Sequence, residues 1–253
     1  MKLIAVYETD VQNDFSLRSG ALFVHGFEEK SSWKPYGAEA RLPNILKMHN
    51  YSKGKENIIL MGSVDKHFYE DAELIRNKGG AFEDHCMNGT PGQLRVDGLE
   101  RQMDIYIQSN EGPGLPQRIL NSKEISDRIT ACLEKKHHLI FEKQAYDVGT
   151  NPNFAPVAAA LIEKGLDAVV IDGFATDYCV KTAALRFKEA AETHGKTIGK
   201  NFSIYVVTDA IHEVNINFEG KIDKEFGRKA LAELYAAGVK PIATEQVLAG
   251  GAI

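Results

Sequence analysis

One cysteine of this chain, Cys179, lies between an expected strand and an expected helix, a position that suits a nucleophile. Cys179 follows an apolar, β-branched run at residues 168–171 and a glycine at 173, and such a run predicts a buried strand. Apolar residues recur at helical spacing over 177–191, which predicts a helix. Cys179 would then lie in the first turn of a helix that leaves the carboxyl end of a strand, where the helix dipole favours a thiolate. The alternative interpretation is a small, buried, apolar cysteine.

A thiol nucleophile needs a base that takes its proton and a positive charge that holds the thiolate. Asp10 comes soon after the apolar run 3–7, and Lys143 follows the short apolar run 139–141. Because parallel strands end at one edge of a sheet, Asp10, Lys143 and Cys179 could converge there. The sequence thus offers a base, a cation and a nucleophile. Taken singly, Asp10 is also typical of a turn residue and Lys143 of a solvated surface charge.

A second group of side chains has the chemistry of a metal site. Asp65 and His67 follow the apolar run 58–64, and His85 lies beyond a glycine pair at 79–80. One carboxylate and two imidazoles suit zinc, and the mixed set also tolerates iron or manganese. An Asp-x-His pair by itself is common in ordinary loops, so the hypothesis depends on the other residues around it.

The elements that must position these groups alternate along the chain. The expected strands cover residues 3–7, 58–64, 139–141, 168–171 and 203–208, and residues 104–108 and 240–244 could each form a further short strand. The expected helices cover residues 38–51, 122–136, 151–164, 177–191 and 221–237. Strands that alternate with helices predict an α/β fold, with about six strands in a parallel sheet covered on both faces. No repeat or linker divides the chain, so we expect a single domain over residues 1–253,.

Composition excludes several classes of function. The chain has 253 residues, a net charge of −5 and no long basic run, so nothing indicates a nucleic-acid partner or an anionic membrane surface. No apolar run reaches the length of a membrane span, and the N-terminus turns acidic too early for a signal peptide. The three cysteines are widely spaced, which predicts no disulfide framework and a reducing, cytoplasmic setting. The sequence leaves the oligomeric state open, and a homo-oligomer is compatible with it.

Sequence blocks in a fixed order resemble the isochorismatase-like cysteine hydrolases, and within them the nicotinamidases. The blocks are Asp-Val-Gln-Asn-Asp-Phe at 10–15, Asp-Lys-His at 65–67, His-Cys at 85–86 followed by Gly-Thr-Pro-Gly at 89–92, Lys143, and Gly-Phe-Ala-Thr-Asp-Tyr-Cys-Val at 173–180. They are scattered over residues 3 to 210. The first and last blocks are specific, and their correct order makes a chance match improbable.

The resemblance implies a fold, an activity and a set of site residues. The fold is a Rossmann-like, three-layer α/β/α sandwich. The implied site comprises a triad of Asp10, Lys143 and Cys179, a divalent metal ion (zinc, with iron and manganese as alternatives) on Asp65, His67 and His85, and two aromatic rings, Phe15 and Phe82, around the substrate. It also implies a cis peptide between Phe174 and Ala175, with the backbone N–H groups of Ala175 and Cys179 facing the substrate carbonyl. The implied reaction hydrolyses nicotinamide to nicotinate and ammonia through a cysteine thioester.

This chain departs from the nicotinamidase pattern around the pocket. Many nicotinamidases have a further histidine shortly after the Asp-x-His pair, and none occurs here over 68–76. The candidate replacements in that stretch are Glu70, Asp71 and Glu73. The segment after Lys143 also differs, and the loops at 16–36 and 93–136 are longer than in compact members. Two alternatives therefore stay open, namely a cysteine amidohydrolase for another small amide or ureide, and a catalytically silent relative that binds a small molecule.

Overall fold

A seven-stranded sheet forms the centre of the computed structural model, which describes residues 2–28, 30–31, 33–110, 112–113, 115–195 and 201–250. The strands are β1 (Leu3–Thr9), β2 (Ile58–Asp65), β3 (Asp104–Ile107), β4 (His138–Lys143), β5 (Leu166–Phe174), β6 (Ser203–His212) and β7 (Lys240–Ile242). Their order is β3-β4-β2-β1-β5-β6-β7, and every neighbouring pair is parallel. The parallel α/β sheet is thus confirmed, with seven strands where about six were expected, because both short segments, β3 and β7, pair at the sheet edges.

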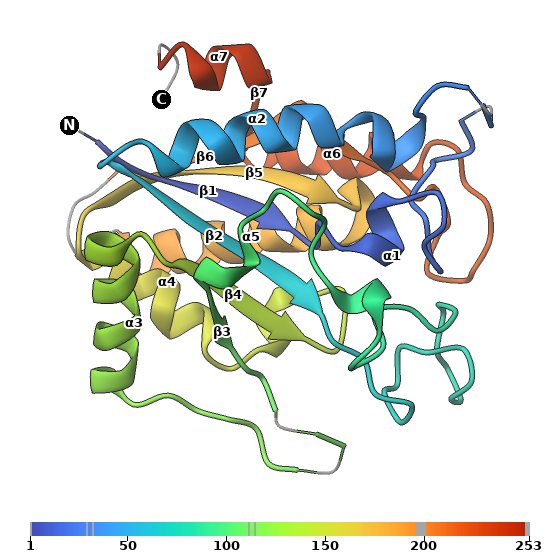
Figure 1. Cartoon of the computed structure of the whole chain (residues 1–253), viewed down its shortest axis with the longest axis horizontal. Helices are drawn as coiled ribbons and strands as arrows, with labels where there is room; N and C mark the ends of the chain where they lie inside the picture. Colours follow the sequence, from blue (N-terminus) through green and yellow to red (C-terminus); the bar gives the residue numbers. More distant parts are fainter. Residues whose placement is uncertain are drawn as a thin grey trace.

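Helices cover both faces of the sheet (Figure 1). They are α1 (Asn13–Ser16), α2 (Leu42–Lys53), α3 (Ser122–Lys135), α4 (Phe154–Glu163), α5 (Lys181–Ala190), α6 (Phe226–Ala236) and α7 (Thr244–Leu248). Side chains of α2 and α7 pack into one buried apolar cluster, and those of α3, α4, α5 and α6 pack into another on the opposite face. The result is the expected three-layer α/β/α sandwich.

Two of the expected elements near the C-terminus have different bounds in the structure. The helix expected over 221–237 begins only at Phe226, because Ile216 and Ile222 form an antiparallel bridge across the preceding turn. The strand expected over 240–244 ends at Ile242, and the short helix α7 follows at once. Apolar spacing in these stretches suits either structure, so it did not distinguish them.

The strand that leads to Cys179 needs the glycine at its end. Gly173 has a φ of 97°, a conformation that favours glycine,. A Cβ at Gly173 would also overlap the backbone of Thr9 in the neighbouring strand β1. After β5 the chain turns through a short π-helical segment, Thr176–Val180, and continues as α5. Cys179 therefore lies where a strand becomes a helix, as predicted, although in a π turn.

Four strand ends meet at one edge of the sheet, on the side where α1 lies in Figure 1. Asp65 is the last residue of β2, Lys143 is the last residue of β4, and the two are paired in register. Strand β1 lies between β2 and β5, so Asp10 sits between Asp65 and the turn that carries Cys179. After β1 the chain builds β2, β3 and β4 on one side of this strand and then β5, β6 and β7 on its other side. The direction therefore changes between β1 and β5, and ligands bind at such a switch point.

No helix in the described ranges combines the length and the apolar composition needed to cross a membrane.

Candidate active site

The structure brings Asp10, Lys143 and Cys179 together. The Lys143 Nζ lies 2.8 Å from the Asp10 Oδ2 and 3.7 Å from the Cys179 Sγ. The Asp10 side chain is held on its other oxygen by the Ser63 hydroxyl, which donates to Oδ1 at 2.7 Å. Asp10 itself has a φ of 47°, a conformation that is uncommon outside glycine. The base, cation and nucleophile expected from three distant segments are thus neighbours.

The three groups are buried, and burial together with their neighbouring charges shifts the pKa of each one. Burial raises the pKa of the Cys179 thiol well above its usual value, and the nearby Asp10 carboxylate adds to this. Burial also raises the pKa of Asp10, although the Lys143 ammonium opposes the shift. Burial alone would lower the pKa of Lys143, but the carboxylates of Asp10 and Asp65 outweigh it and raise that pKa well above its usual value. Lys143 therefore stays charged, and the thiol holds its proton until a base removes it.

Four side chains offer ligand atoms for a metal ion beside this triad. One such atom from each of Asp65, His67, Glu73 and His85 lies within 4.8 Å of all the others. The Nε2 atoms of His67 and His85 are 3.8 Å and 3.6 Å from the Asp65 Oδ2, and the Glu73 Oε2 is 3.5 Å from the His67 Nε2. Asp65 also contacts Lys143, whose ammonium helps to hold the pKa of that carboxyl well below its usual value against the opposing effect of burial.

Neighbouring groups orient both histidines toward this centre. The Nδ1 of His67 lies 3.0 Å from the Asp71 Oδ2, and the Nδ1 of His85 lies 2.6 Å from the Glu83 carbonyl oxygen. Each contact is to an acceptor, so each Nδ1 donates its proton away from the centre and each Nε2 faces the centre, where it could bind an ion. Within the described part of the chain, the buried Nε2 of His67 has no hydrogen-bond partner. A divalent ion would satisfy that atom, so the donor set fits such an ion.

The structure distinguishes the three acidic residues proposed as a fourth ligand. Glu73 joins the cluster, with its other oxygen accepting the backbone N–H of Tyr146 at 2.9 Å. Asp71 instead holds His67 from behind, and it also accepts the backbone N–H of Phe68. Glu70 is exposed. The sequence could name this stretch but could not choose within it, because the choice depends on how the loop after β2 turns.

A glutamine that sequence reasoning left without a role holds the end of β2 in place. The Gln12 side chain accepts the backbone N–H of Asp65 at 2.7 Å and donates to the Asp65 carbonyl at 2.8 Å. It also donates to the carbonyl of Gln93 at 2.7 Å. Gln12 is fully buried, so these bonds fix the backbone of a metal-ligand candidate relative to the segment that follows Asp10. The signal was present in the specific block 10–15.

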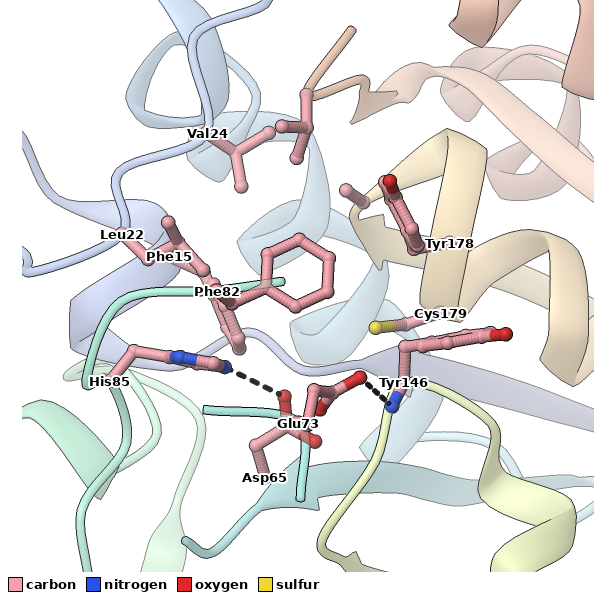
Figure 2. A pocket seen from close by; sticks show the side chains of 12 residues that line it. Phe15, Leu22, Val24, Asp65, Glu73, Phe82, His85, Tyr146, Tyr178 and Cys179 are labelled. Carbon is pink, nitrogen blue, oxygen red and sulfur yellow. Dashed lines mark hydrogen bonds and ion pairs between the residues drawn. The ribbon is translucent and has the colours of Figure 1, made fainter. Parts of the chain in front are cut away.

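A small, largely apolar pocket lies over these groups, as Figure 2 shows. About 320 Å³ of space, part of it open to solvent, lies between its walls. Its lining comprises Phe15, Leu22, Val24, Asp65, Glu73, Phe82, His85, Tyr146, Ala175, Tyr178, Cys179 and Val214. The structure therefore places the three expected substrate-contacting residues, Phe15, Phe82 and Ala175, in the wall of this pocket. The Cys179 sulfur and the Asp65 carboxylate open into the same space (Figure 2).

Two tyrosines in the pocket wall were not selected from the sequence. The ring of Tyr178 packs edge-on against Phe82, with centroids 5.2 Å apart, and against Tyr146 at 5.5 Å. The Tyr178 hydroxyl donates to the carbonyl of Ile216 at 2.6 Å, so this ring is held from outside the pocket. Tyr178 precedes Cys179 within the specific block, whereas nothing in the sequence marked Tyr146.

The peptide bond between Phe174 and Ala175 is cis, as the family resemblance implies. The turn that follows is tied to a distant loop, because the Asp177 carboxylate accepts the backbone N–H groups of Val214 and Asn215 at 3.0 Å and 2.7 Å. These bonds hold the segment that immediately precedes Cys179.

Comparison with known proteins gives matches among solved structures alone, since no protein-family model and no curated protein matches the sequence. The pyrazinamidase of Pyrococcus horikoshii in complex with zinc is 22% identical, with a TM-score of 0.57 over 95% of this chain and 98% of that one. An isochorismatase-like hydrolase from Alkaliphilus metalliredigens is 17% identical, with a TM-score of 0.60 and 98% of both chains covered. A protein of L. infantum in complex with nicotinate is 19% identical, with a TM-score of 0.61 over 96% of this chain and 94% of that one.

The chain has the fold of the isochorismatase-like hydrolases. Nearly the full length of each matched structure is covered, so the likeness extends over the whole sandwich and includes the edge where the four strand ends meet. At these identities the likeness concerns the fold.

Proposed function

We propose that the protein is a metal-assisted amidohydrolase that converts nicotinamide to nicotinate and ammonia. One observation carries the proposal. The Cys179 sulfur, in contact with Lys143 and close to Asp10, opens into the same small pocket as the carboxylates and the imidazole of the metal-ligand cluster. A nucleophile, a base and a Lewis-acid position on one cavity form a site for acyl transfer to water.

The metal ion would be held by Asp65, His67, Glu73 and His85. When bound there, it would supply a Lewis-acid position for the ring nitrogen of a heteroaromatic amide. Zinc suits this mixture of imidazole and carboxylate ligands, and iron or manganese would also be accommodated. Support for zinc comes from the donor set and from the zinc complex of the structurally similar pyrazinamidase.

The chain's own residues would perform the first half of the reaction. Asp10 takes the proton from the Cys179 thiol, whose raised pKa makes such a base necessary,. The sulfur forms a bond to the carboxamide carbon, and the Lys143 ammonium compensates the negative charge that moves between Asp10 and Cys179. The backbone N–H groups of Ala175 and Cys179 would receive the carbonyl oxygen as it becomes an oxyanion, which in other hydrolases contributes about 3 kcal/mol per donor.

Collapse of the tetrahedral adduct breaks the carbon–nitrogen bond. Asp10 returns its proton to the leaving nitrogen, and ammonia departs while the acyl group stays on sulfur as a thioester. Asp10 then takes a proton from a water molecule, whose oxygen attacks the thioester carbon. The acid is released, and the sulfur regains its proton through Asp10. One carboxylate therefore serves every proton transfer, which its contact with Lys143 and its place beside the sulfur permit.

The pocket walls favour a flat ring as the substrate body. Phe15, Phe82 and Tyr178 surround the space in front of Cys179, and the Phe15 ring lies 5.2 Å from that of His85. Aromatic side chains bind planar rings through offset and edge contacts. The pocket is small, so it suits only a small, flat ligand. The nicotinate complex of the L. infantum structure further supports a pyridine ring in a pocket of this fold.

A second candidate is an amide or ureide with a longer, anionic substituent. A second, larger hollow that is open to solvent adjoins the first, because Leu22 and Val214 line both. Its walls include Arg18, His25 and Lys30, which would suit a carboxylate or phosphate. The same triad would cleave such a substrate, so this alternative differs in specificity and shares the mechanism.

An ammonia-release screen of small amides and ureides, with and without chelator, tests the proposal. Nicotinamide should be the best substrate, release should be lost on chelation and regained with zinc, and Cys179→Ala should abolish it. Release from an anionic amide alone would favour the second candidate. A metal-loaded protein that releases ammonia from no member of the screen would contradict both and leave a binding protein with this fold.

We further propose that the protein acts in the cytoplasm, where nicotinamide hydrolysis would serve NAD salvage. The three cysteines are free and buried, as expected of a chain that folds in a reducing compartment.

A further inference from the structure

A second cluster of histidines and carboxylates lies on the sheet face that α2 covers. His49 of α2 and His138 at the start of β4 lie edge to face, with ring centroids 5.2 Å apart. Glu100 completes the cluster, and one ligand atom from each residue lies within 4.8 Å of the others. None of these residues belongs to the cluster beside Cys179. Both imidazoles are almost fully buried, with exposed fractions of 0% and 2%.

Each imidazole is held from behind by a buried carboxylate. The His49 Nδ1 lies 2.7 Å from the Glu8 Oε1, and the His138 Nδ1 lies 3.0 Å from the Asp104 Oδ1. A carboxylate at this distance fixes the proton on Nδ1 and leaves the Nε2 lone pair available. This carboxylate–histidine arrangement orients the histidine ligands of metal sites and raises their basicity.

The Nε2 of His49 is buried and lacks a hydrogen-bond partner among the residues that the structure describes. The Glu100 Oε2 is 4.0 Å away from this atom, which is too long for a hydrogen bond. Burying an unpaired polar atom is costly. A ligand that sits between His49, His138 and Glu100 would remove this cost.

Glu100 is positioned to be the third ligand. Its backbone has a φ of 45°, and the Lys53 ammonium holds its Oε1 at 2.9 Å. The other oxygen is left on the side of His49. The Glu100 side chain is 34% exposed, so the cluster has a route to solvent although its two imidazoles are buried.

The net charge of the groups around the cluster favours a bound cation. Arg95 pairs with both supporting carboxylates, Glu8 and Asp104. Burial and the neighbouring Glu8 carboxylate hold the nearby Asp172 in its neutral form by raising its pKa well above the usual range. With neutral imidazoles, the three carboxylates of Glu8, Asp104 and Glu100 face the two cations Arg95 and Lys53. The local charge is therefore negative before any ion binds.

We infer that His49, Glu100 and His138 form a second binding site for a divalent transition-metal ion such as zinc. Two imidazoles and one carboxylate are a common zinc ligand set, and water completes the coordination. The ion would connect α2, β4 and the segment before β3, so its role would be to hold these elements together. This site does not depend on the proposed amidohydrolase activity, because it shares no ligand with the pocket.

Counting bound metal on the intact protein tests the inference. Protein freed of metal by chelator dialysis is equilibrated with excess zinc, desalted and analysed by elemental mass spectrometry. We expect two zinc ions per chain, and crystals of the zinc-loaded protein should show two anomalous peaks at the zinc edge. One peak should lie between the His49 and His138 rings. One ion per chain with no density between those rings would overturn the inference.

Two matched variants assign the ligands. Glu100→Gln should weaken the second ion about 10-fold or more and leave the first in place. Asp97→Asn, a nearby change at a side chain that is 96% exposed, should bind both ions as the parent does. The converse variant, His85→Ala, should lose the first ion and retain the second. Two ions bound with parental affinity by Glu100→Gln would contradict the ligand set.

Discussion

Glu73 is a carboxylate of the pocket that is already oriented for a metal ion. Its Oε2 faces the His67 Nε2 at 3.5 Å while its Oε1 accepts a backbone N–H, so the carboxylate is held in place before any ion arrives. Burial raises the pKa of this carboxyl, and the neighbouring Asp65 charge adds to the shift. A divalent ion would reverse that effect, because it favours the charged form.

Replacing Glu73 should therefore weaken the active-site ion. We expect Glu73→Gln to bind zinc about 10-fold or more weakly, whereas Glu70→Gln, at an exposed position in the same loop, should bind as the parent does. Isothermal titration of metal-free protein measures both, in a Glu100→Gln background so that the active-site ion dominates. Equal affinities for the two variants would show that Glu73 is not a ligand.

Asp10 has two effects on Cys179 that one substitution should separate. Its negative charge contributes to the raised pKa of the thiol, so Asp10→Asn should lower that pKa and speed the alkylation of Cys179 by iodoacetamide at pH 8. The same change removes the proposed base, so ammonia release should fall about 100-fold or more. Peptide mass spectrometry distinguishes Cys179 from Cys86 and Cys132. Slower alkylation together with slower hydrolysis would contradict the assignment.

At the scale of elements, strand β5 carries a buried acid near its carboxyl end. Asp172 is fully buried, and neither of its oxygens has a hydrogen-bond partner within the described ranges. Burial raises its pKa well above the usual value, and Glu8 adds to this. The native state therefore retains a proton that the unfolded chain loses near pH 4. Stability conferred by this proton falls as the pH rises from there toward the folded-state pKa.

The Asp172→Asn variant removes this titration. Its free energy of unfolding relative to the parent should increase between pH 5 and pH 8, by up to about 1.4 kcal/mol per pH unit. Urea unfolding at several pH values, with chelator present, measures the difference. The exposed change Asp97→Asn serves as the control, and its difference from the parent should stay constant. A constant difference for Asp172→Asn as well would show that Asp172 ionises in the folded protein.

Helices and strands could be predicted from the sequence where a periodic apolar pattern was followed by a glycine or a polar residue that ended it. Asp65 and Lys143 end their strands, Asp10 follows its strand directly, and Cys179 follows its strand after a short turn. Strand ends and site residues could therefore be predicted together. The cluster around His49 could not, because its members are far apart in sequence and each one alone is typical of a solvated charge. Only the pairing of β3 with β4 brings Asp104 beside His138.

At the scale of the whole molecule, the order of strands brings the site together. Lys143 reaches Asp65 because β4 lies beside β2, and Asp10 reaches both because β1 follows in the sheet. Sequence alone predicts that the strands are parallel, but it does not order them. The family resemblance constrained that order indirectly, because it implied that Asp10, Lys143 and Cys179 lie in one site.

Metal binding should stabilise the whole fold, since the ligands of both clusters come from different elements. Zinc at about 100 times its dissociation constant adds about 2.7 kcal/mol per site. We expect thermal unfolding of metal-free protein to shift upward with zinc, and to shift less in Glu100→Gln than in Asp97→Asn. An unchanged midpoint in every variant would indicate that zinc does not bind the native state in preference to the unfolded one.

The single ammonium of Lys143 is shared between Asp10 and Asp65, and in the proposed mechanism this sharing would couple proton transfer to metal binding. When an ion neutralises Asp65, Lys143 is free to serve Asp10. When the ion is removed, Asp65 competes for the same ammonium, and the acid limb of the rate profile should move to higher pH. Benzamide, which has no ring nitrogen to coordinate, should therefore still be hydrolysed more slowly after chelation. Equal benzamide turnover with and without zinc would show that the ion acts on the substrate alone.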